Sequence, residues 1–237
     1  MGLKEGLKGW SDDLLSMFFP ALCEVCGRPL VKGEDVICTA CNLDMPRCNF
    51  HTDPFNTLHQ RLAGHAPIER AAGYFYYYRG DMFTQAVLAA KYKNRPNALR
   101  VLARNFAEEI SADGFFDGID LIVPVPMHWR KRLSRGYNQT DYLALGLSEA
   151  TGIAIGHNLK AVRSHSTQTR KGAFERWRNS LDTYEVVGVE SLAGKHLLVV
   201  DDVITTGATM LACCEALHRA LPDATLSVLA LGVTNLQ

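Results

Sequence analysis

One run in the C-terminal half of the chain, residues 197–210, restricts the fold more than any other feature. Four apolar residues precede two adjacent carboxylates, Asp201 and Asp202, and the turn sequence Thr-Thr-Gly-Ala-Thr follows. This order is typical of a buried strand that ends in a turn and leads directly into a helix. Ligands of open α/β sheets bind beyond the carboxyl ends of the strands, so this turn is a candidate ligand site.

The rest of the chain beyond residue 70 alternates between the same two patterns. Short apolar or β-branched runs predict strands at 73–78, 121–125, 197–200 and 225–231. Helical spacing of apolar residues, with caps and stops, predicts helices at 81–91, 97–112, 138–151 and 206–221. Alternating strands and helices favour an α/β fold with a doubly wound, mostly parallel sheet.

The first 50 residues have a different character, rich in Cys, Gly, Pro and charge. We expect a helix and a small metal-bound module in 1–50, a connector in 51–72 and the α/β domain in 73–237. The stretch 10–22 predicts a short amphipathic helix packed on the protein, with a membrane-surface anchor as the alternative.

Bulk properties set limits on function. The chain has 237 residues and a formal net charge of zero, so nothing in its overall charge demands nucleic acid or an acidic membrane as partner. Charged residues interrupt the N-terminal segment, which argues against a secretory signal, and no apolar run reaches the length of a membrane span. An odd count of seven cysteines favours a reducing compartment, so we expect a cytoplasmic protein.

Four of the cysteines have metal-ligand spacing. Two CxxC pairs are separated by eleven residues, and two such turns supply the four soft ligands of tetrahedral Zn²⁺. A closed four-thiolate site is structural, because no position is left for water or substrate. Unlinked reduced thiols or a redox CxxC are the alternatives, and Cys48 and His51 are spare donors. The predicted ligands are Cys23, Cys26, Cys38 and Cys41.

The turn after the paired carboxylates suits a phosphate. A helix N-terminus offers unpaired N–H groups and a partial positive charge, and Gly207 allows a close backbone approach. Hydroxyls of Thr205, Thr206 and Thr209 add donors. Carboxylates would repel phosphate but accept hydrogen bonds from a diol, which favours a sugar phosphate over phosphate alone. An ordinary strand–turn–helix with a polar cap is the alternative.

Two further segments are basic. Residues 123–139 carry Arg130, Lys131, Arg132 and Arg135 after a predicted strand, which suits a pyrophosphate group, whereas a solvated basic loop is the alternative. Residues 163–179 are polar, basic and weakly periodic, as in a lid that closes over a charged substrate or in a passive linker.

The run from Leu197 resembles the phosphoribosyl pyrophosphate (PRPP) motif of type I phosphoribosyltransferases. The resemblance implies that the two aspartates bind the ribose 2′- and 3′-hydroxyls, that the turn binds the 5′-phosphate, and that Mg²⁺ accompanies PRPP. If the chain is an enzyme, we expect catalytic roles for Asp201 and Asp202, which hold the ribose, and for Arg135, which stabilises the leaving pyrophosphate. The expected PRPP-binding residues are Asp201, Asp202, Val203, Thr205, Thr206, Gly207, Ala208, Thr209, Lys91, Arg130 and Arg135.

Nearly the whole chain resembles the ComF (GntX-like) family, whose members are linked to competence and DNA uptake. The shared features are the CxxC pairs, Met45-Pro46, Lys91-Tyr92, the segment 124–139, and the PRPP-like run. The resemblance implies a type I phosphoribosyltransferase fold with an N-terminal zinc module. The predicted lid includes Arg163, Gln168, Thr169, Arg170, Arg176 and Asn179. The resemblance extends to Gln168, Thr169, Arg176 and Asn179 of this set, whereas residues 170–172 depart from the family pattern.

Three functions remain open from sequence alone. The first is an enzyme that transfers the phosphoribosyl group of PRPP to an unidentified acceptor with release of pyrophosphate. The second is a PRPP- or nucleotide-sensing module without turnover. The third is a competence adaptor in which the zinc module and the segment 130–135 bind single-stranded DNA or a helicase partner.

Overall fold

The computed structural model describes residues 20–64, 66–78, 80–92, 94–162 and 183–234. The chain divides into two compact units, Met1–Met45 and Pro46–Gln237. Most of the predicted N-terminal helix at 10–22 lies outside the described residues. No helix within the described ranges has the length and apolar character needed to cross a membrane.

The first unit is built around its cysteines. Helix α2 (Thr39–Leu43) begins directly after Cys38 and buries Cys41. Gly27 adopts a φ of +71°, a left-handed conformation that closes the turn after the first CxxC pair. Leu22 and Pro29 form an antiparallel bridge across this turn. The predicted cysteine module is therefore present as a unit with its own backbone hydrogen bonds.

A five-stranded parallel sheet forms the centre of the second unit, which confirms the predicted fold class. The sheet order is β1-β7-β6-β2-β3. Its strands are β1 (Ile68–Tyr76), β7 (Thr225–Val233), β6 (His196–Ile204), β2 (Leu121–Pro124) and β3 (Ala154–Ile155). A separate antiparallel ribbon consists of β4 (Leu159–Ala161) and β5 (Tyr184–Val186).

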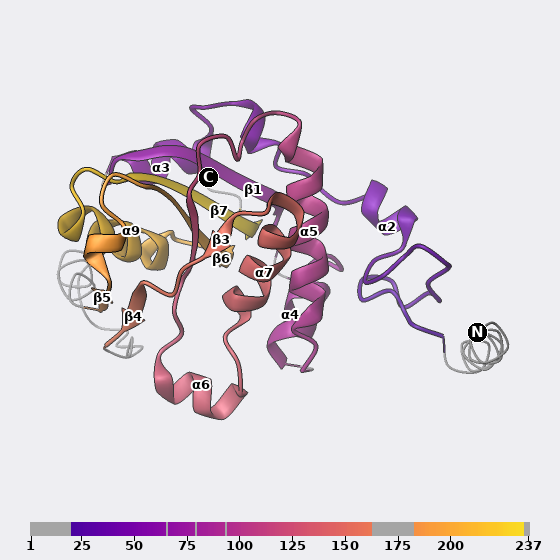
Figure 1. Cartoon of the computed structure of the whole chain (residues 1–237). Coiled ribbons are helices and arrows are strands. Elements are labelled where there is room, and N and C mark those ends of the chain that lie inside the picture. The colour runs from indigo at the N-terminus through magenta and orange to yellow at the C-terminus, as the bar shows by residue number, and fades with distance from the viewer. Residues whose placement is uncertain (1–19, 65, 79, 93, 163–182, 235–237) are drawn as a thin grey trace, which may run out of the picture. The chain divides into compact units, whose positions relative to one another are not determined.

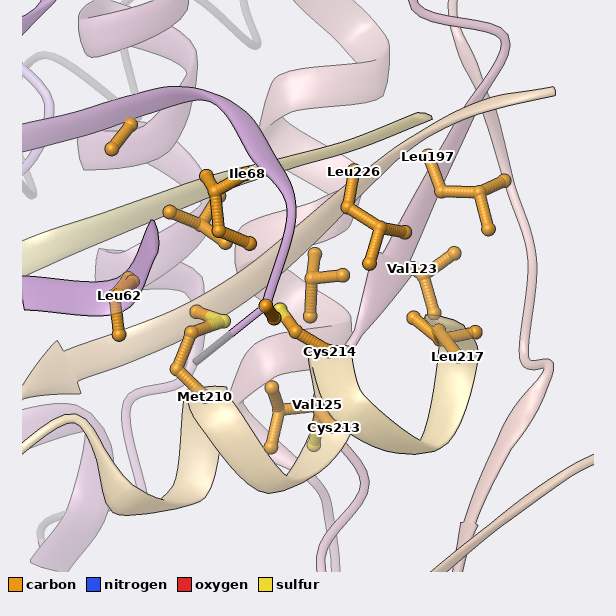
Figure 2. Close-up of a cluster of buried hydrophobic side chains, with 14 of the residues drawn as sticks. Leu62, Ile68, Val123, Val125, Leu197, Met210, Cys213, Cys214, Leu217 and Leu226 are labelled. Carbon is orange, nitrogen blue, oxygen red and sulfur yellow. The ribbon is translucent and has the colours of Figure 1, made fainter. Parts of the chain in front are cut away.

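Helices cover both faces of this sheet (Figure 1). On one face lie α3 (Thr57–Ala63) and α9 (Ala208–Ala220), and Figure 2 shows their side chains beside those of the strands. On the other side lie α5 (Asn97–Ser111) and α7 (Gln139–Thr151), preceded by α4 (Thr84–Tyr92). The other helices among the described residues of this unit are α6 (Trp129–Arg135) and the 3-10 turns η1 (Phe50–Thr52) and η2 (Val189–Ser191).

Helices α5 and α7 approach each other very closely. A side chain at Gly146 of α7 would overlap the backbone carbonyl of Arg100 in α5. The absence of a Cβ therefore sets the distance between these two helices.

Three sequence predictions need correction. Strand β1 begins at Ile68 rather than at Gly73, because β7 pairs with it from Ile68 onward. The stretch 51–72, expected to be a connector, thus contains η1, α3 and the start of β1, all within the second unit. Strand β6 continues to Ile204 instead of ending at Val200, because β7 remains hydrogen-bonded to it that far.

The two strands beside β6 pair with it over different lengths. On the β2 side the pairing stops at Val200, opposite Pro124, whereas on the β7 side it runs on to Ile204. Asp201 and Asp202 therefore lie in a part of β6 that has a neighbouring strand on one side only. This notch leaves open space beside both carboxylates.

Candidate functional site

The notch lies at the topological switch point of the sheet. The chain leaves β2 through α7 to β3, on one side, and leaves β6 through α9 to β7, on the other. Parallel α/β sheets bind ligands at this crevice between diverging connections. A cavity of about 550 Å³ is found there. Its lining includes Lys91, Tyr92, Val125, Pro126, Met127, His128, Lys131, Ser134, Arg135, Asn138, Gln139, Thr140, Ala161, Tyr184, Asp201, Asp202, Val203 and Thr209.

The paired carboxylates have different partners. Asp202 is only 7% exposed, and its Oδ2 lies 2.9 Å from Lys91 Nζ. The Asp202 backbone N–H donates to Asp201 Oδ1 at 2.8 Å. Asp202 thus faces a cation in the cavity rather than the apolar core.

Asp201 is easier to protonate than an ordinary aspartate. Burial and the neighbouring charge of Asp202 raise its pKa from 3.8 to about 7, while the Asp202 N–H and Lys91 act in the opposite direction. Both carboxylates reach the cavity, as expected for groups that accept hydrogen bonds from hydroxyls.

Tyr184 lies near Asp201 in the cavity lining and was not identified from the sequence. It comes from the ribbon strand β5, lines the cavity and shares a hydrogen bond with the thiol of Cys213 in α9. Burial raises the pKa of Tyr184 and that of Cys213, so both groups stay neutral near pH 7. Tyr184 and Cys213 therefore add no positive charge that would stabilise an ionised Asp201.

The turn that leads into α9 has the features predicted for a phosphate site. Gly207 is the N-cap with a φ of +82°, and as a glycine it has no side chain of its own to cap the first turn of the helix. Thr206 Oγ1 accepts weakly from the Ala208 N–H at 3.4 Å. Thr209 lines the cavity, and Thr205 and Thr206 are exposed beside it. Backbone N–H groups and hydroxyls are thus available to an anion.

Three cations also line the cavity, and one of them is the Lys91 that pairs with Asp202. Lys91, Lys131 and Arg135 are among its lining residues, and the Arg135 guanidinium lies 5.6 Å from the centre of the Tyr92 ring. Arg130 lies outside the lining, with its guanidinium over the Trp129 ring at 5.2 Å. The structure therefore brings the predicted Arg135 and Lys91 together, adds Lys131 and leaves Arg130 on the surface.

The start of α7 supplies further polar groups. The Thr140 hydroxyl and the Asn138 side-chain amide both donate to the Val125 carbonyl, at 2.6 and 3.2 Å, which fixes the helix start at the end of β2. Gln139 is 3% exposed, and its Nε2 is buried without a hydrogen-bond partner among the described residues. A buried unpaired donor is costly, so a ligand that accepts from it would be favoured.

The predicted lid lies outside the described residues. This applies to Arg163, Gln168, Thr169, Arg170, Arg176 and Asn179. The chain on either side is described: β4 and β5 pair with each other, and the Val162 N–H donates to the Thr183 carbonyl at 2.9 Å.

The four cysteine thiols form a candidate metal centre in the first unit. The sulfur atoms of Cys23, Cys26, Cys38 and Cys41 all lie within 4.8 Å of one another, and those of Cys26 and Cys38 are 3.7 Å apart. Zn–S bonds of about 2.3 Å in a tetrahedral site put sulfur atoms about 3.8 Å apart, so the cluster fits zinc.

Hydrogen bonds to the sulfurs support the same assignment. Arg28 Nε donates to Cys26 Sγ at 3.4 Å, and the Cys38 N–H donates to Cys23 Sγ at 3.3 Å. Donation from the Arg28 backbone and side chain lowers the pKa of Cys26 to about 6. The two spare donors are used elsewhere: Cys48 is buried in the apolar core of the second unit, and His51 Nε2 lies 3.2 Å from Asp113 Oδ2.

Known proteins resemble this chain at several levels. The model of the phosphoribosyl transferase domain matches residues 89–230. The DNA utilization protein YhgH of Salmonella typhi is 28% identical over 212 residues, which cover 84% of this chain and 92% of the relative. Competence protein ComFC of Bacillus subtilis is 23% identical over 191 residues, covering 80% and 68%. Competence protein F of Haemophilus influenzae is 34% identical over 93 residues, covering 38% and 41%.

Two solved structures resemble part of this chain, with 19% sequence identity. They are the allosteric regulatory enzyme of purine biosynthesis, with a TM-score of 0.36, and the glutamine PRPP amidotransferase of B. subtilis, with a TM-score of 0.37. The matches cover 54% of this chain and 25% and 26% of the two structures, about a quarter of their length.

Proposed function

Because the chain belongs to the phosphoribosyl transferase domain family, we propose that the cavity between β2 and β6 binds PRPP and that its phosphoribosyl group passes to an acceptor. The relatives named for competence and DNA utilization agree with the ComF resemblance of the sequence. One observation carries the proposal: two carboxylates in a one-sided notch of β6 precede a turn that leads into a helix whose N-cap, Gly207, has no side chain to occupy the first N–H groups.

The ribose and its phosphate take the β6–α9 side of the cavity. Asp201 and Asp202 accept hydrogen bonds from the 2′- and 3′-hydroxyls, and the turn Thr205–Thr209 binds the 5′-phosphate through backbone N–H groups and hydroxyls. Carboxylates and N–H donors point to different parts of the same molecule, which fixes its orientation.

The pyrophosphate group takes the opposite side. Lys91, Lys131 and Arg135 supply positive charge, and Gln139 Nε2 is an unused donor. Charge develops on pyrophosphate as its bond to the anomeric carbon breaks, so these groups stabilise the transition state more than the ground state. The carboxylates Asp201 and Asp202 are the hard oxygen donors of the cavity that suit Mg²⁺, which would neutralise pyrophosphate charge when bound.

The reaction is a substitution at the anomeric carbon. The C–O bond to pyrophosphate breaks, a bond to the acceptor forms, and the acceptor loses a proton. The acceptor in this proposal is a nitrogen nucleophile. The segment 163–179 would close over the reactants and exclude water, a role supported by its basic, polar sequence.

Calorimetry of the double variant Asp201→Asn/Asp202→Asn with PRPP and Mg²⁺ tests the binding site. We expect loss of PRPP binding with the fold retained, whereas Asp223→Asn, a change at an exposed carboxylate, should bind like the parent. Unchanged affinity in the double variant would refute the assignment. Pyrophosphate release across a panel of amines and nucleobases then tests turnover, and PRPP binding without release would favour the sensing module.

A second candidate function rests on helix α6. The helix has no buried residue; Trp129 is 56% exposed and Leu133 is 76% exposed. Arg130, Lys131 and Arg132 flank these side chains, and no acidic residue occurs between positions 121 and 140. Exposed aromatic and basic groups suit single-stranded DNA, by stacking and phosphate contacts.

Fluorescence anisotropy with a labelled single-stranded oligonucleotide tests this second function. We expect binding that weakens steeply with salt and that falls about tenfold in Trp129→Ala, since one stacking contact contributes about 1–3 kcal/mol. No binding by the parent protein at low salt would exclude this function.

A further inference from the structure

Arg61 reaches the phosphate turn from a distant part of the chain. It lies on α3, and its Nη1 donates to the Thr205 carbonyl at 2.8 Å. The two residues are 144 positions apart. Arg61 also precedes the segment 89–230 that the family model matches.

Local packing holds this arginine against the turn. The neighbouring Leu62 is fully buried in the core between α3 and α9 (Figure 2). A Cβ built on Gly207 would lie 3.2 Å from Leu62 Cδ2 and 3.7 Å from Arg61 Cδ. The aliphatic stem of Arg61 therefore runs along the turn, and its guanidinium is positioned by the buried residue beside it.

The charge of Arg61 is not explained by the contact with Thr205 alone. The Thr205 carbonyl already accepts from Thr234 Oγ1 at 3.1 Å, so it is satisfied without a cation. A guanidinium has five N–H donors, and within the described ranges Arg61 forms no ion pair and makes this one hydrogen bond. Unused donors on a fixed cation stand beside exposed Thr205 and Thr206.

We infer that Arg61 is a phosphate-binding residue, which holds the turn through Nη1 and directs its remaining N–H donors to the 5′-phosphate of the ligand. The inference rests on the proposed PRPP site and adds to it a cation from outside the matched segment. Guanidinium groups recognise phosphate by charge-assisted, often paired, hydrogen bonds. Cations from two sides of the sheet would then bind the two ends of PRPP separately, with Arg61 serving the 5′ end.

The two ends can be tested with separate probes. Ribose 5-phosphate carries only the 5′-phosphate, and inorganic pyrophosphate represents the other end. In calorimetry we expect Arg61→Met to lower the affinity for ribose 5-phosphate by about tenfold to a hundredfold, which corresponds to the loss of one charged hydrogen bond. Pyrophosphate affinity should change less than about twofold, because its cations lie across the cavity.

Two variants separate charge from support of the turn. Thr234→Val removes the neutral hydrogen bond to the same Thr205 carbonyl, and Arg61→Lys keeps the charge on a similar stem. We expect Arg61→Lys to retain most of the ribose 5-phosphate affinity and Thr234→Val to lose less than about threefold. Both also provide folded proteins if Arg61→Met is unstable.

The outcomes distinguish the inference from the proposed function. Equal losses in Arg61→Met and Thr234→Val, or equal losses for both probes, would reduce Arg61 to a structural support and overturn the inference. A parent protein that binds neither PRPP nor ribose 5-phosphate would instead overturn the proposed function.

Discussion

Lys91 Nζ lies 2.9 Å from Asp202 Oδ2, inside the cavity at the switch point of the sheet. Lys91 lies in the last turn of α4, whereas Asp202 belongs to β6, so the pair joins two elements that are distant in sequence. The ion pair balances a buried carboxylate, because an unpaired charge at a site of 7% exposure would be costly. A sugar hydroxyl that binds Asp202 would release Lys91 toward a phosphate.

This relationship predicts opposite effects of two substitutions on inorganic pyrophosphate. Asp202→Asn should strengthen pyrophosphate binding by about threefold to tenfold, because it frees Lys91 and removes a repelling charge. Lys91→Met should weaken it by about tenfold. Calorimetry with pyrophosphate on the two single variants and on the double variant gives the coupling free energy between Lys91 and Asp202. If Asp202→Asn strengthens binding as much in the Lys91→Met background, Lys91 is not exchanged between the two partners.

Stability should depend on pH through Asp201. Its pKa is raised from 3.8 to about 7, so the folded protein holds a proton more tightly than the unfolded chain in this interval. The free energy of unfolding therefore falls as pH rises through this interval. Above pH 7 Asp201 is ionised in the folded protein, and the destabilisation by its buried charge reaches its full size. Tyr184 and Cys213 beside it stay neutral, since their pKa values are raised.

Asp201→Asn should remove this slope. Between pH 5 and pH 8 the free energy of unfolding should shift in favour of the variant by about 2–3 kcal/mol relative to the parent. Chemical denaturation at both pH values measures the shift. The exposed Asp223→Asn variant controls for the change in net charge, and parallel profiles for the two variants would contradict the prediction.

Metal removal should act on the first unit. We expect one zinc per chain by elemental analysis and its loss in Cys38→Ser, because three thiolates leave the tetrahedral site incomplete. Limited proteolysis after chelation should cut between the CxxC pairs, since metal binding and folding of such modules are coupled. Cys48→Ala is the matched control and should retain zinc. Loss of zinc from that variant would place Cys48 among the ligands.

Gly146→Ala should destabilise the second unit although alanine favours helices. The added methyl would overlap the Arg100 carbonyl, so α5 and α7 must separate, at a cost of about 1–3 kcal/mol. Gly64→Ala is the comparison, because a methyl group added there would meet no atom within 4 Å and the φ of Gly64 is −67°. Thermal denaturation should show a lower midpoint for Gly146→Ala alone, and equal midpoints would contradict the prediction.

Features with a local cause were predictable without coordinates. The spacing of the four cysteines allows two metal-binding turns, and the sulfurs do converge. The apolar runs predicted as strands at 121–125, 197–200 and 225–231 correspond to β2, β6 and β7, because a parallel sheet covered on both faces buries side chains on both of its faces. The turn at Gly207 requires a left-handed residue before α9, and the glycine supplies it.

Element ends were less predictable, because strand pairing decides them. Pairing with β7 extends β1 back to Ile68 and extends β6 forward to Ile204. The sequence of β1 or β6 does not show that β7 lies beside it. The same pairing leaves Asp201 and Asp202 in a one-sided part of β6, which creates the notch.

Contacts between distant segments were decided by the tertiary structure alone. The sequence identified the motif and predicted a chemistry for it, because residue type, spacing and hydrophobic period are local properties. It did not reveal Tyr184, Gln139 or Arg61, or the pairing of Lys91 with Asp202. Those depend on which helices and strands the folded sheet brings to one edge, and this follows from the packing of the whole unit rather than from any single segment.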